Sequence, residues 1–317
     1  MDHLKQSLSP IVLFVYNRLL HTQQTIQALK KNHLATQSEL FIFSDAAKGS
    51  KDKESVDAIR KFIETIDGFK KVTIYKNQYN AGLANNIIKG VSKILHEYGK
   101  AIVLEDDLIT SPYFLSYMNK ALNLYENQAN IFSISGFNYP PEIFTLPSYY
   151  KYDVYLNYRS CSWGWATWKD RWAKTDWAMT DYKEFSRRHH DKKLFNRGGD
   201  DLYDKLKDAM NGLTNSWAIR WAYTHYKYNA YAVYPRYSYI NNIGFDNSGT
   251  HCKKPLYPEN DIAVAVKEPY LPENLEPDHE VIHRHTLIHK YSTSRKIKEL
   301  TKYLILYRKW KPSLSKL

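Results

Sequence analysis

The sequence predicts an α/β protein, with a mostly parallel β-sheet flanked by helices, an aromatic-rich region after it and a basic helix at the C-terminus. Over the first 140 residues, apolar strand-like runs alternate with helical patterns, and this spacing is typical of βαβ units. The chain of 317 residues is 43% hydrophobic. That is enough apolar material for a core, so a wholly disordered protein is excluded.

The alternating elements follow one another in a regular order. We expect strands at 11–16, 40–44, 72–75, 101–104 and 131–135, and helices near 22–31, 53–66, 84–98 and 112–125. The second helical stretch carries Val56, Ile59, Ile63 and Ile66 on one face, as a helix packed on a sheet would. Pro112 suits the first turn of its helix, where its missing N–H costs nothing. Parallel sheets bind ligands beyond the carboxyl ends of their strands, so we expect the chemistry there.

The rest of the chain has a different character. Residues 138–249 are rich in Trp and Tyr and show no clean alternation, so we expect helices and loops laid over the sheet and not a separately folding unit. From His283 to Leu317, ten lysines and arginines stand against one acid, Glu299. Apolar residues recur there at spacings of three and four, which predicts an amphipathic helix, at Ile297, Leu300, Leu304, Tyr307 and Trp310.

Three interpretations of this basic helix remain open. It could lie on an anionic membrane surface, pack on the body of the protein with its basic face in solvent, or bind nucleic acid. The remainder of the chain is nearly neutral, which disfavours a nucleic-acid groove. We therefore expect no nucleic-acid partner.

Composition also bears on location. No apolar run approaches the roughly 18–20 residues that cross a bilayer, and the first residues show no signal-type stretch. Two cysteines cannot build a disulfide scaffold, and no CxxC metal motif exists. We expect a cytoplasmic protein, peripheral on the cytoplasmic face of the membrane if the basic helix binds there. Cys161 and Cys252 lack a His–acid partner pattern and are expected to be reduced, structural residues.

The sharpest signal is Glu105-Asp106-Asp107, which follows the apolar run 101–104. Three adjacent carboxylates repel one another and resist burial, so they are tolerated mainly where a cation offsets them. Hard oxygen ligands select Mg²⁺ or Mn²⁺. The alternative is that one acid caps a following helix, which explains one carboxylate and not three.

Other strand ends also carry polar residues. Asn17 and Arg18 follow the first strand, and Asp45 and Lys48 follow the second. Asp45 could accept the N3–H of a uracil ring, while Arg18 or Lys48 could meet phosphate. After the third strand, a turn with Asn80 and Gly82 opens a helix, and helix N-termini favour anions. Each residue alone is as well explained as an ordinary loop, cap or turn residue; their shared placement is what favours a site.

These motifs together resemble the nucleotide-sugar glycosyltransferases of the GT-A fold. The resemblance is carried by residues 10–18, Ser44-Asp45, Asn80-x-Gly82-Leu83 and Glu105-Asp106-Asp107-Leu108-x-x-x-Pro112-x-Phe114, and it continues through 160–168 and 242–251. It covers roughly residues 8–252. The motifs are similar to those of bacterial capsule and lipopolysaccharide transferases and of the N-acetylglucosaminyltransferase that initiates complex N-glycans.

The resemblance implies a division of the chain and a set of donor-site roles. Residues 1–137 would form the nucleotide-sugar-binding half, 138–255 the acceptor-binding half of the same domain, and 256–317 an extension. Asp107 would bind Mn²⁺ or Mg²⁺. His251 would be a second metal or phosphate ligand, although a lone histidine is usually structural. Asp106 would lie near the ribose or donor sugar, Glu105 near the sugar hydroxyls and Asp45 at the base. The nucleotide pocket would also be lined by Tyr16, Asn17, Arg18, Lys48, Asn80 and Gly82, and Arg220 would help to hold the diphosphate.

On the acceptor side, Trp163-Gly164-Trp165 could stack indoles on a pyranose, although Trp is often plain core. Metal-dependent relatives mostly invert the anomeric centre, a reaction that needs a carboxylate base. The eukaryotic relative has an Asp where this chain has Ala218, so either the base comes from elsewhere or the correspondence between the two sequences is shifted here. The candidates are Asp200, Asp201 and Asp246, and Asp201 could instead cap the helix that follows it.

The sequence therefore favours a metal-dependent, inverting glycosyltransferase. It would move a sugar from a UDP-sugar, UDP-GlcNAc or a related hexose, to a glycan or lipid-diphosphate-linked acceptor in surface-polysaccharide synthesis. One alternative is a sugar-nucleotide nucleotidyltransferase, which the absence of glycine in residues 17–20 counts against. Another is a non-catalytic carbohydrate-binding module, which leaves the acidic motif unexplained.

Overall fold

A computed structural model describes residues 8–246 and 258–291. Its centre is an eight-stranded sheet with the strand order β3-β2-β1-β4-β8-β6-β9-β7. The strands are β1 (Ile11–Val15), β2 (Glu39–Ser44), β3 (Lys71–Lys76), β4 (Lys100–Glu105), β6 (Ile131–Ser135), β7 (Val154–Asn157), β8 (Trp165–Trp168) and β9 (Tyr231–Pro235). The strands from β1 to β4 are parallel to one another, as are β6 and β9, while β7 and β8 run antiparallel to their neighbours. The predicted α/β class with a mostly parallel sheet is confirmed.

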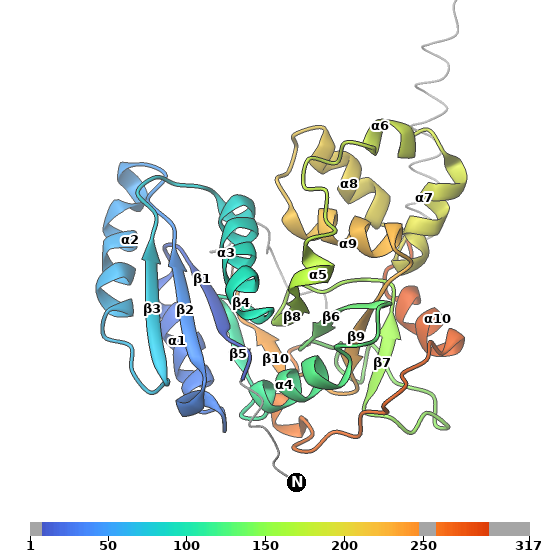
Figure 1. Cartoon of the computed structure of the whole chain (residues 1–317), viewed down its shortest axis with the longest axis horizontal. Helices are drawn as coiled ribbons and strands as arrows, with labels where there is room; N and C mark the ends of the chain where they lie inside the picture. Colours follow the sequence, from blue (N-terminus) through green and yellow to red (C-terminus); the bar gives the residue numbers. More distant parts are fainter. Residues whose placement is uncertain (1–7, 247–257, 292–317) are drawn as a thin grey trace, which may run out of the picture.

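Helices cover both faces of the sheet (Figure 1). The longer ones are α1 (Leu19–Lys30), α2 (Ser50–Ile63), α3 (Leu83–Tyr98), α4 (Phe114–Leu124), α8 (Leu202–Met210), α9 (Trp217–Lys227) and α10 (His279–Leu287). The short ones are α5 (Lys169–Trp172), α6 (Tyr182–Phe185) and α7 (His189–Phe195). In Figure 1, α1 to α3 surround the strands β1 to β4, and α5 to α9 gather above β8, β6 and β9.

The side chains of β1 show how the two faces are filled. Ile11 and Leu13 belong to one hydrophobic cluster, which also holds residues of α1, α2 and α4. Val12 and Phe14, which alternate with them, belong to a second cluster with residues of α3, α5 and α9. Successive side chains of a strand point to opposite faces, so an uninterrupted apolar run is what a strand buried on both faces requires.

Every element predicted in the first 140 residues is present, and each begins and ends within three residues of the expected bounds. Pro112 precedes its helix instead of beginning it, since α4 starts at Phe114. The expectation for residues 138–249 is wrong in one respect. This region supplies β7, β8 and β9 to the central sheet, and β10 (Ile240–Asn242), which pairs with β5 (Leu108–Thr110).

None of the helices in the described residues is both long enough and apolar enough to span a bilayer. The predicted basic helix at 297–310 lies outside the described residues.

Candidate functional site

The carboxyl ends of β1, β2 and β4 meet at one edge of the sheet, because these strands are parallel and β1 pairs with both of the others. Arg18 follows β1, Asp45 follows β2 and Asp106 follows β4. The structure thus brings together the strand ends on which the sequence prediction depends.

Arg18 lies between two of the three motif carboxylates. Its Nη2 donates to Asp106 and to Oδ2 of Asp107, at 2.8 Å in the second pair. Asp106 and Asp107 are 4% and 8% exposed, so these two carboxylates are not directed into bulk water. The alternative that one acid caps a following helix is wrong, because β5 follows Asp107 and α4 begins only at Phe114.

The negative charge of the motif is only partly balanced. Removal from water, together with the neighbouring carboxylates, raises the pKa of Glu105. Burial also raises the pKa of Asp106, although Arg18 opposes this. Burial works against the charge of Arg18 itself, but Asp106 and Asp107 raise its pKa, so it stays protonated. Three acids beside one arginine leave excess negative charge when all are ionised, and a further cation would offset it.

Two features of the structure around Arg18 and Asp107 are compatible with an anionic ligand and a metal ion bound there. Nη1 of Arg18 is buried and has no hydrogen-bond partner among the described residues, so a donor remains for an anion. Gly244 lies against the motif, because a Cβ there would be 2.2 Å from Oδ2 of Asp107 and 3.2 Å from Nη1 of Arg18. Within residues 8–246 and 258–291, no group of three or more His, Cys, Asp or Glu side chains could hold a metal ion. Mg²⁺ is commonly held by one or two carboxylates together with substrate phosphates and water, and Asp107 beside this arginine fits such a site.

Asp45 organises the loop that opens α3. Its Oδ1 accepts from the N–H of Ala81 at 2.9 Å, and its Oδ2 accepts from the N–H of Gly82 at 3.0 Å. Oδ1 also accepts from the Asn77 side chain and the N–H of Ala46. Oδ1 thus accepts three hydrogen bonds and Oδ2 only one, so acceptor capacity for a further donor remains on Oδ2. The predicted contact with a base can therefore involve only that oxygen.

The other predicted nucleotide-pocket residues surround this loop. Oη of Tyr16 donates to Asp52 at 2.9 Å and accepts from the N–H of Lys48 at 3.1 Å. Asn80 donates to a main-chain carbonyl after β2 at 2.7 Å. The Lys48 side chain is exposed and Asn17 is half-buried. Hydrogen bonds thus tie the ends of β1 and β2 together, and the Lys48 ammonium remains at the rim.

The chain returns to the acidic motif after β10. The N–H of Ile243 donates to the carbonyl of Asp107 at 2.9 Å, and Oδ2 of Asp246 lies 3.2 Å from Nε2 of His21 in α1. Asp246, a predicted base, therefore lies close to the helix that follows β1. His251, the second predicted metal ligand, and Cys252 lie outside the described residues.

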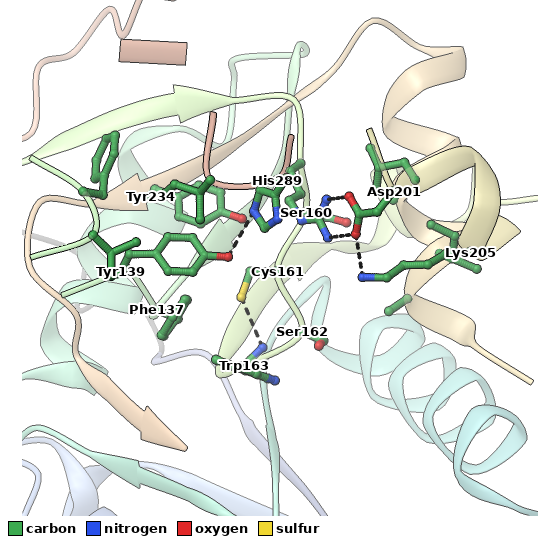
Figure 2. Close-up of a pocket in the computed structure, with 18 of the residues that line it drawn as sticks. Phe137, Tyr139, Ser160, Cys161, Ser162, Trp163, Asp201, Lys205, Tyr234 and His289 are labelled. Carbon is green, nitrogen blue, oxygen red and sulfur yellow. Dashed lines mark hydrogen bonds and ion pairs between the residues drawn. The ribbon is translucent and has the colours of Figure 1, made fainter. Parts of the chain in front are cut away.

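A cavity of about 1190 Å³ opens beside this segment. In Figure 2, Phe137, Tyr139 and Tyr234 lie to one side of it, and Asp201 and Lys205 to the other. Aliphatic side chains of α8, α9 and the end of α10 complete the lining, namely Leu202, Ile219, Ala222, Leu287 and Ile288. Aromatic walls with a few charged groups are typical of a site for an organic ligand.

Of the Trp163-Gly164-Trp165 segment, only Trp163 lines the cavity. Trp165 is 1% exposed and stacks on Trp217 with the ring centroids 5.0 Å apart, so no face of its ring is left for a sugar. Gly164 has φ +58, and a Cβ there would lie 2.7 Å from the side chain of Ile240. Packing, and not a ligand, requires this glycine. The predicted acceptor contacts of Trp165 and Gly164 are therefore wrong.

Asp201 lines the cavity and is held by two cations. Nη1 and Nη2 of Arg159 donate to its two oxygens, both at 2.9 Å, and Nζ of Lys205 lies 2.7 Å from Oδ2. Although burial disfavours its charge, these cations hold the pKa of Asp201 below its usual range. Asp201 stands at the N-cap position of α8, but its side chain makes no capping hydrogen bond. The capping alternative is therefore wrong.

Asp200, Ala218 and Arg220 also figured in the sequence prediction, and only Ala218 lines the cavity with Asp201. Oδ2 of Asp200 accepts from the N–H of Tyr291 at 3.0 Å, and Asp200 is not among the cavity-lining residues. Ala218 does line the cavity. Arg220, predicted near the diphosphate, donates to Asn215 at 3.3 Å, and this contact lies on the loop before α9 and not at the acidic motif.

Sequence reasoning missed Arg159, Tyr139 and His289, which lie on the cavity wall. Oη of Tyr139 and Nε2 of His289 are 3.0 Å apart (Figure 2). Burial, reinforced by Arg159, lowers the pKa of His289 to about 3, so its ring is neutral at physiological pH. The Tyr139–His289 and Arg159–Asp201 partners are 150 and 42 positions apart in the sequence, so no local spacing could have identified them.

Cys161 also lines the cavity, and its Sγ accepts from the N–H of Trp163 at 3.5 Å. Burial raises the pKa of its thiol. A raised pKa keeps the thiol protonated, as expected of a structural cysteine.

Comparison with known proteins gives a family match. The family model described as "Glycosyl transferase family 2" matches residues 11–198, which include β1, the acidic motif and Trp163. No curated protein matches the chain.

Solved structures with local similarity include the mannosyltransferase PcManGT from Pyrobaculum calidifontis, in complex with GDP-Man and Mn²⁺. It is 11% identical with a TM-score of 0.37, over 55% of this chain and 51% of that one. S. aureus TarS is 12% identical with a TM-score of 0.28, over 39% of this chain and 21% of that one. The chain thus spans about half of the first structure and a fifth of the second.

Proposed function

The chain belongs to glycosyl transferase family 2 and is a glycosyltransferase, and from this premise we propose that it is a metal-dependent, inverting enzyme that uses a UDP-sugar. The donor would be UDP-GlcNAc or a related UDP-hexose. The acceptor would be a glycan or a lipid-diphosphate-linked sugar in surface-polysaccharide synthesis. The choice of acceptor is supported by the sequence resemblance and by the basic C-terminal sequence.

The proposal rests on one observation: two consecutive residues, Gly244 and Phe245, contact the acidic motif and the cavity respectively. Gly244 lies against Asp107, and the next residue, Phe245, lines the cavity and lies edge-on to Trp163 with ring centroids 5.6 Å apart. A transferase needs a donor diphosphate and an acceptor hydroxyl next to each other, and this arrangement supports the proposal that the two bind in neighbouring sites.

On the donor side, Arg18 would bind the diphosphate through its unpartnered Nη1. Asp107, with His251 as a candidate second ligand, would hold Mn²⁺ or Mg²⁺, and such an ion would stabilise negative charge on the departing nucleoside diphosphate. Asp106 and Glu105 would contact the ribose and the sugar. The base and the rest of the nucleotide would lie along the loop that Asp45 organises, beside Tyr16, Asn17, Lys48, Asn80 and Gly82.

On the acceptor side, the cavity would hold the sugar whose hydroxyl attacks the anomeric carbon. The new C–O bond forms as the bond to the diphosphate breaks, the leaving group takes the electron pair, and the hydroxyl proton passes to a carboxylate. Of the three predicted bases, Asp201 lines the cavity, and Arg159 and Lys205 keep it ionised. A low pKa keeps it deprotonated at every working pH but also makes it a weak base.

The donor reaction is tested by incubating the protein with Mn²⁺ and a panel of nucleotide sugars and measuring the released nucleoside diphosphate. We expect slow hydrolysis of a UDP-sugar that EDTA abolishes. Asp107→Ala should lower the rate by about 100-fold, the usual effect of removing a charge-stabilising group. Asp67→Ala, at an exposed carboxylate paired with Lys30, is the matched control. Activity that survives both EDTA and Asp107→Ala would refute the metal assignment.

The base is tested with Asp201→Asn, Asp200→Asn and Asp246→Asn, which keep the side-chain shape. We expect Asp201→Asn to reduce sugar transfer by about 100-fold or more, as for the loss of a general base, and the other two to have smaller effects. Unfolding temperatures of the three variants check that the fold persists. A larger effect of Asp246→Asn would move the proton acceptor to the donor side.

A further inference from the structure

The end of α10 and the residues after it, 286–291, lie along the loop that carries Asp201. Oγ1 of Thr286 donates to the carbonyl of Arg197 at 3.1 Å, and the N–H of Asp200 donates to the carbonyl of His289 at 3.2 Å. The family model matches residues 11–198, so this segment and Asp200, Asp201 and Asp204 all lie beyond the match. The contacts between them thus join two parts of the chain that the match does not cover.

Tyr291 binds this loop at two acids. Its N–H donates to Oδ2 of Asp200 at 3.0 Å, and its Oη donates to Oδ2 of Asp204 at 2.6 Å. Asp200 and Asp204 stand on either side of Asp201 in the sequence. Through these two hydrogen bonds, one tyrosine restrains the chain before and after Asp201.

The loop has little room to shift at Gly199. This residue has φ +145, and a Cβ there would lie 2.7 Å from Nη1 of Arg159, 2.8 Å from Oδ1 of Asp201 and 2.8 Å from Cβ of His289. The main chain is therefore packed between the arginine that holds Asp201 and the segment after α10. Movement of that segment would be transmitted to Asp201.

The same segment forms part of the cavity. Leu287, Ile288 and His289 line it together with Asp201, and His289 contacts Tyr139 on the same wall. The end of α10 thus shapes the space for the ligand and also contacts the loop that presents the carboxylate to it.

We propose that Tyr291 is a positioning residue for Asp201: by binding Asp200 and Asp204 it fixes the Asp201 carboxylate on the cavity wall. This inference rests on the proposed function, in which Asp201 accepts the acceptor's proton. A misplacement of about 1 Å at a reacting group can lower turnover by about 100-fold, so partial loosening of this loop is measurable.

The test compares Tyr291→Phe with Tyr98→Phe in the full chain. Both remove a hydroxyl that contacts a carboxylate, because Oη of Tyr98 donates to Glu39 at 3.0 Å, away from the cavity. We expect Tyr291→Phe to lower kcat of sugar transfer by about tenfold, to leave UDP affinity with Mn²⁺ unchanged, and to speed amide hydrogen exchange in residues 197–204. Tyr98→Phe should change none of these.

A second variant removes the acceptor of the same hydrogen bond, the carboxylate of Asp204. Asp204→Ala should lower kcat to a similar extent, and the double variant should be no slower than the slower single one, since both remove one interaction. Unchanged kcat and unchanged exchange in Tyr291→Phe would overturn the proposal. So would an equal loss of UDP affinity and kcat, because that result indicates a general loss of structure.

The exchange measurement separates this inference from the proposed function. If the wild-type protein transfers no sugar from any donor of the panel, the proposed function fails. Faster exchange confined to residues 197–204 in Tyr291→Phe would still uphold the restraint of the loop by Tyr291, and unchanged exchange would refute it.

Discussion

A Cβ atom at Gly244 would lie 2.2 Å from Oδ2 of Asp107. Real Cβ atoms do not approach an oxygen so closely, so a larger residue at position 244 must displace either the carboxylate or the main chain. The main chain there is held by the hydrogen bond from Ile243 to the carbonyl of Asp107. The contact therefore links the predicted metal ligand to the wall of the cavity.

Gly244→Ala tests this link. We expect at least about a tenfold loss of nucleoside diphosphate release from a UDP-sugar, because the displaced Asp107 no longer holds its charge where the diphosphate lies. Gly49→Ala is the matched control, since a Cβ at Gly49 meets nothing within 4 Å and its φ of −165 is ordinary extended backbone. Equal rates for the two variants would contradict the role given to Gly244.

Arg18→Met tests the electrostatics of the acidic motif. Removing one partner of a buried ion pair leaves uncompensated charge, so we expect the free energy of unfolding to fall by about 3 kcal/mol. Added Mn²⁺ or Mg²⁺ should then raise the unfolding temperature of the variant more than that of the wild type, because a divalent cation can take the place of the guanidinium. Denaturation with and without the cation measures both effects.

The control for Arg18→Met is Lys30→Met, which removes an exposed ion pair with Asp67. Exposed pairs contribute little, so its unfolding temperature should stay at the wild-type value in either condition. A variant at Arg18 with wild-type stability and the wild-type response to cations would show that the acids do not depend on this arginine.

The proposed donor site was predictable because the sequence information for it is local. A buried parallel strand is a short apolar run, and its last residues must face the ligand edge of the sheet. Glu105, Asp106 and Asp107 follow such a run directly, so the sequence alone places them. The divalent cation predicted to offset them stays a prediction, while Arg18, which the sequence analysis expected near phosphate, pairs with Asp106 and Asp107.

The proposed acceptor site was less predictable because its contacts join distant parts of the chain. Asp201 was found as one of three acids, but its partner Arg159 is 42 positions away, and Tyr291 is 91 positions from Asp200. The tryptophans show a second limit. Trp163 and Trp165 are two residues apart, yet the turn at Gly164 sends one to the cavity and the other into the core.

Substitutions of these two tryptophans should have different effects, one on acceptor binding and the other on the free energy of unfolding. Trp163→Ala removes a ring from the cavity wall, and we expect about a tenfold higher KM for the acceptor with little change in unfolding temperature. Trp165→Ala removes a fully buried indole and should lower the free energy of unfolding by about 3–5 kcal/mol. Transfer kinetics and chemical denaturation of both variants decide this. The reverse pattern would place the acceptor against Trp165.

His285 predicts a pH dependence of stability. It is fully buried, and both ring nitrogens lack a hydrogen-bond partner among the described residues. Burial, with His289 and Arg159 adding to it, holds the pKa of His285 well below its usual value. Burial likewise lowers the pKa of His225 to about 4 and of His289 to about 3. A histidine in the unfolded chain has a pKa of about 6.5. Below that pH the unfolded chain therefore binds more protons than the folded one. As a result, the free energy of unfolding falls as the pH is lowered from about 6.5 toward about 4.

His285→Phe should weaken this dependence and stabilise the protein. Phenylalanine keeps an aromatic ring among Tyr139, Phe144 and Tyr234 and removes two unpaired polar atoms, so we expect about 1 kcal/mol of added stability at pH 7. At pH 5 the slope of stability against pH should fall by up to about 1.4 kcal/mol per pH unit, the contribution of one titrating group. Urea denaturation at pH 7, 6 and 5 measures both quantities.

His225→Phe is the informative comparison, because it removes a titrating group but also breaks the hydrogen bond to Ser133. It should flatten the slope and still lower stability at pH 7, whereas a His285→Phe variant with the wild-type slope would contradict the account.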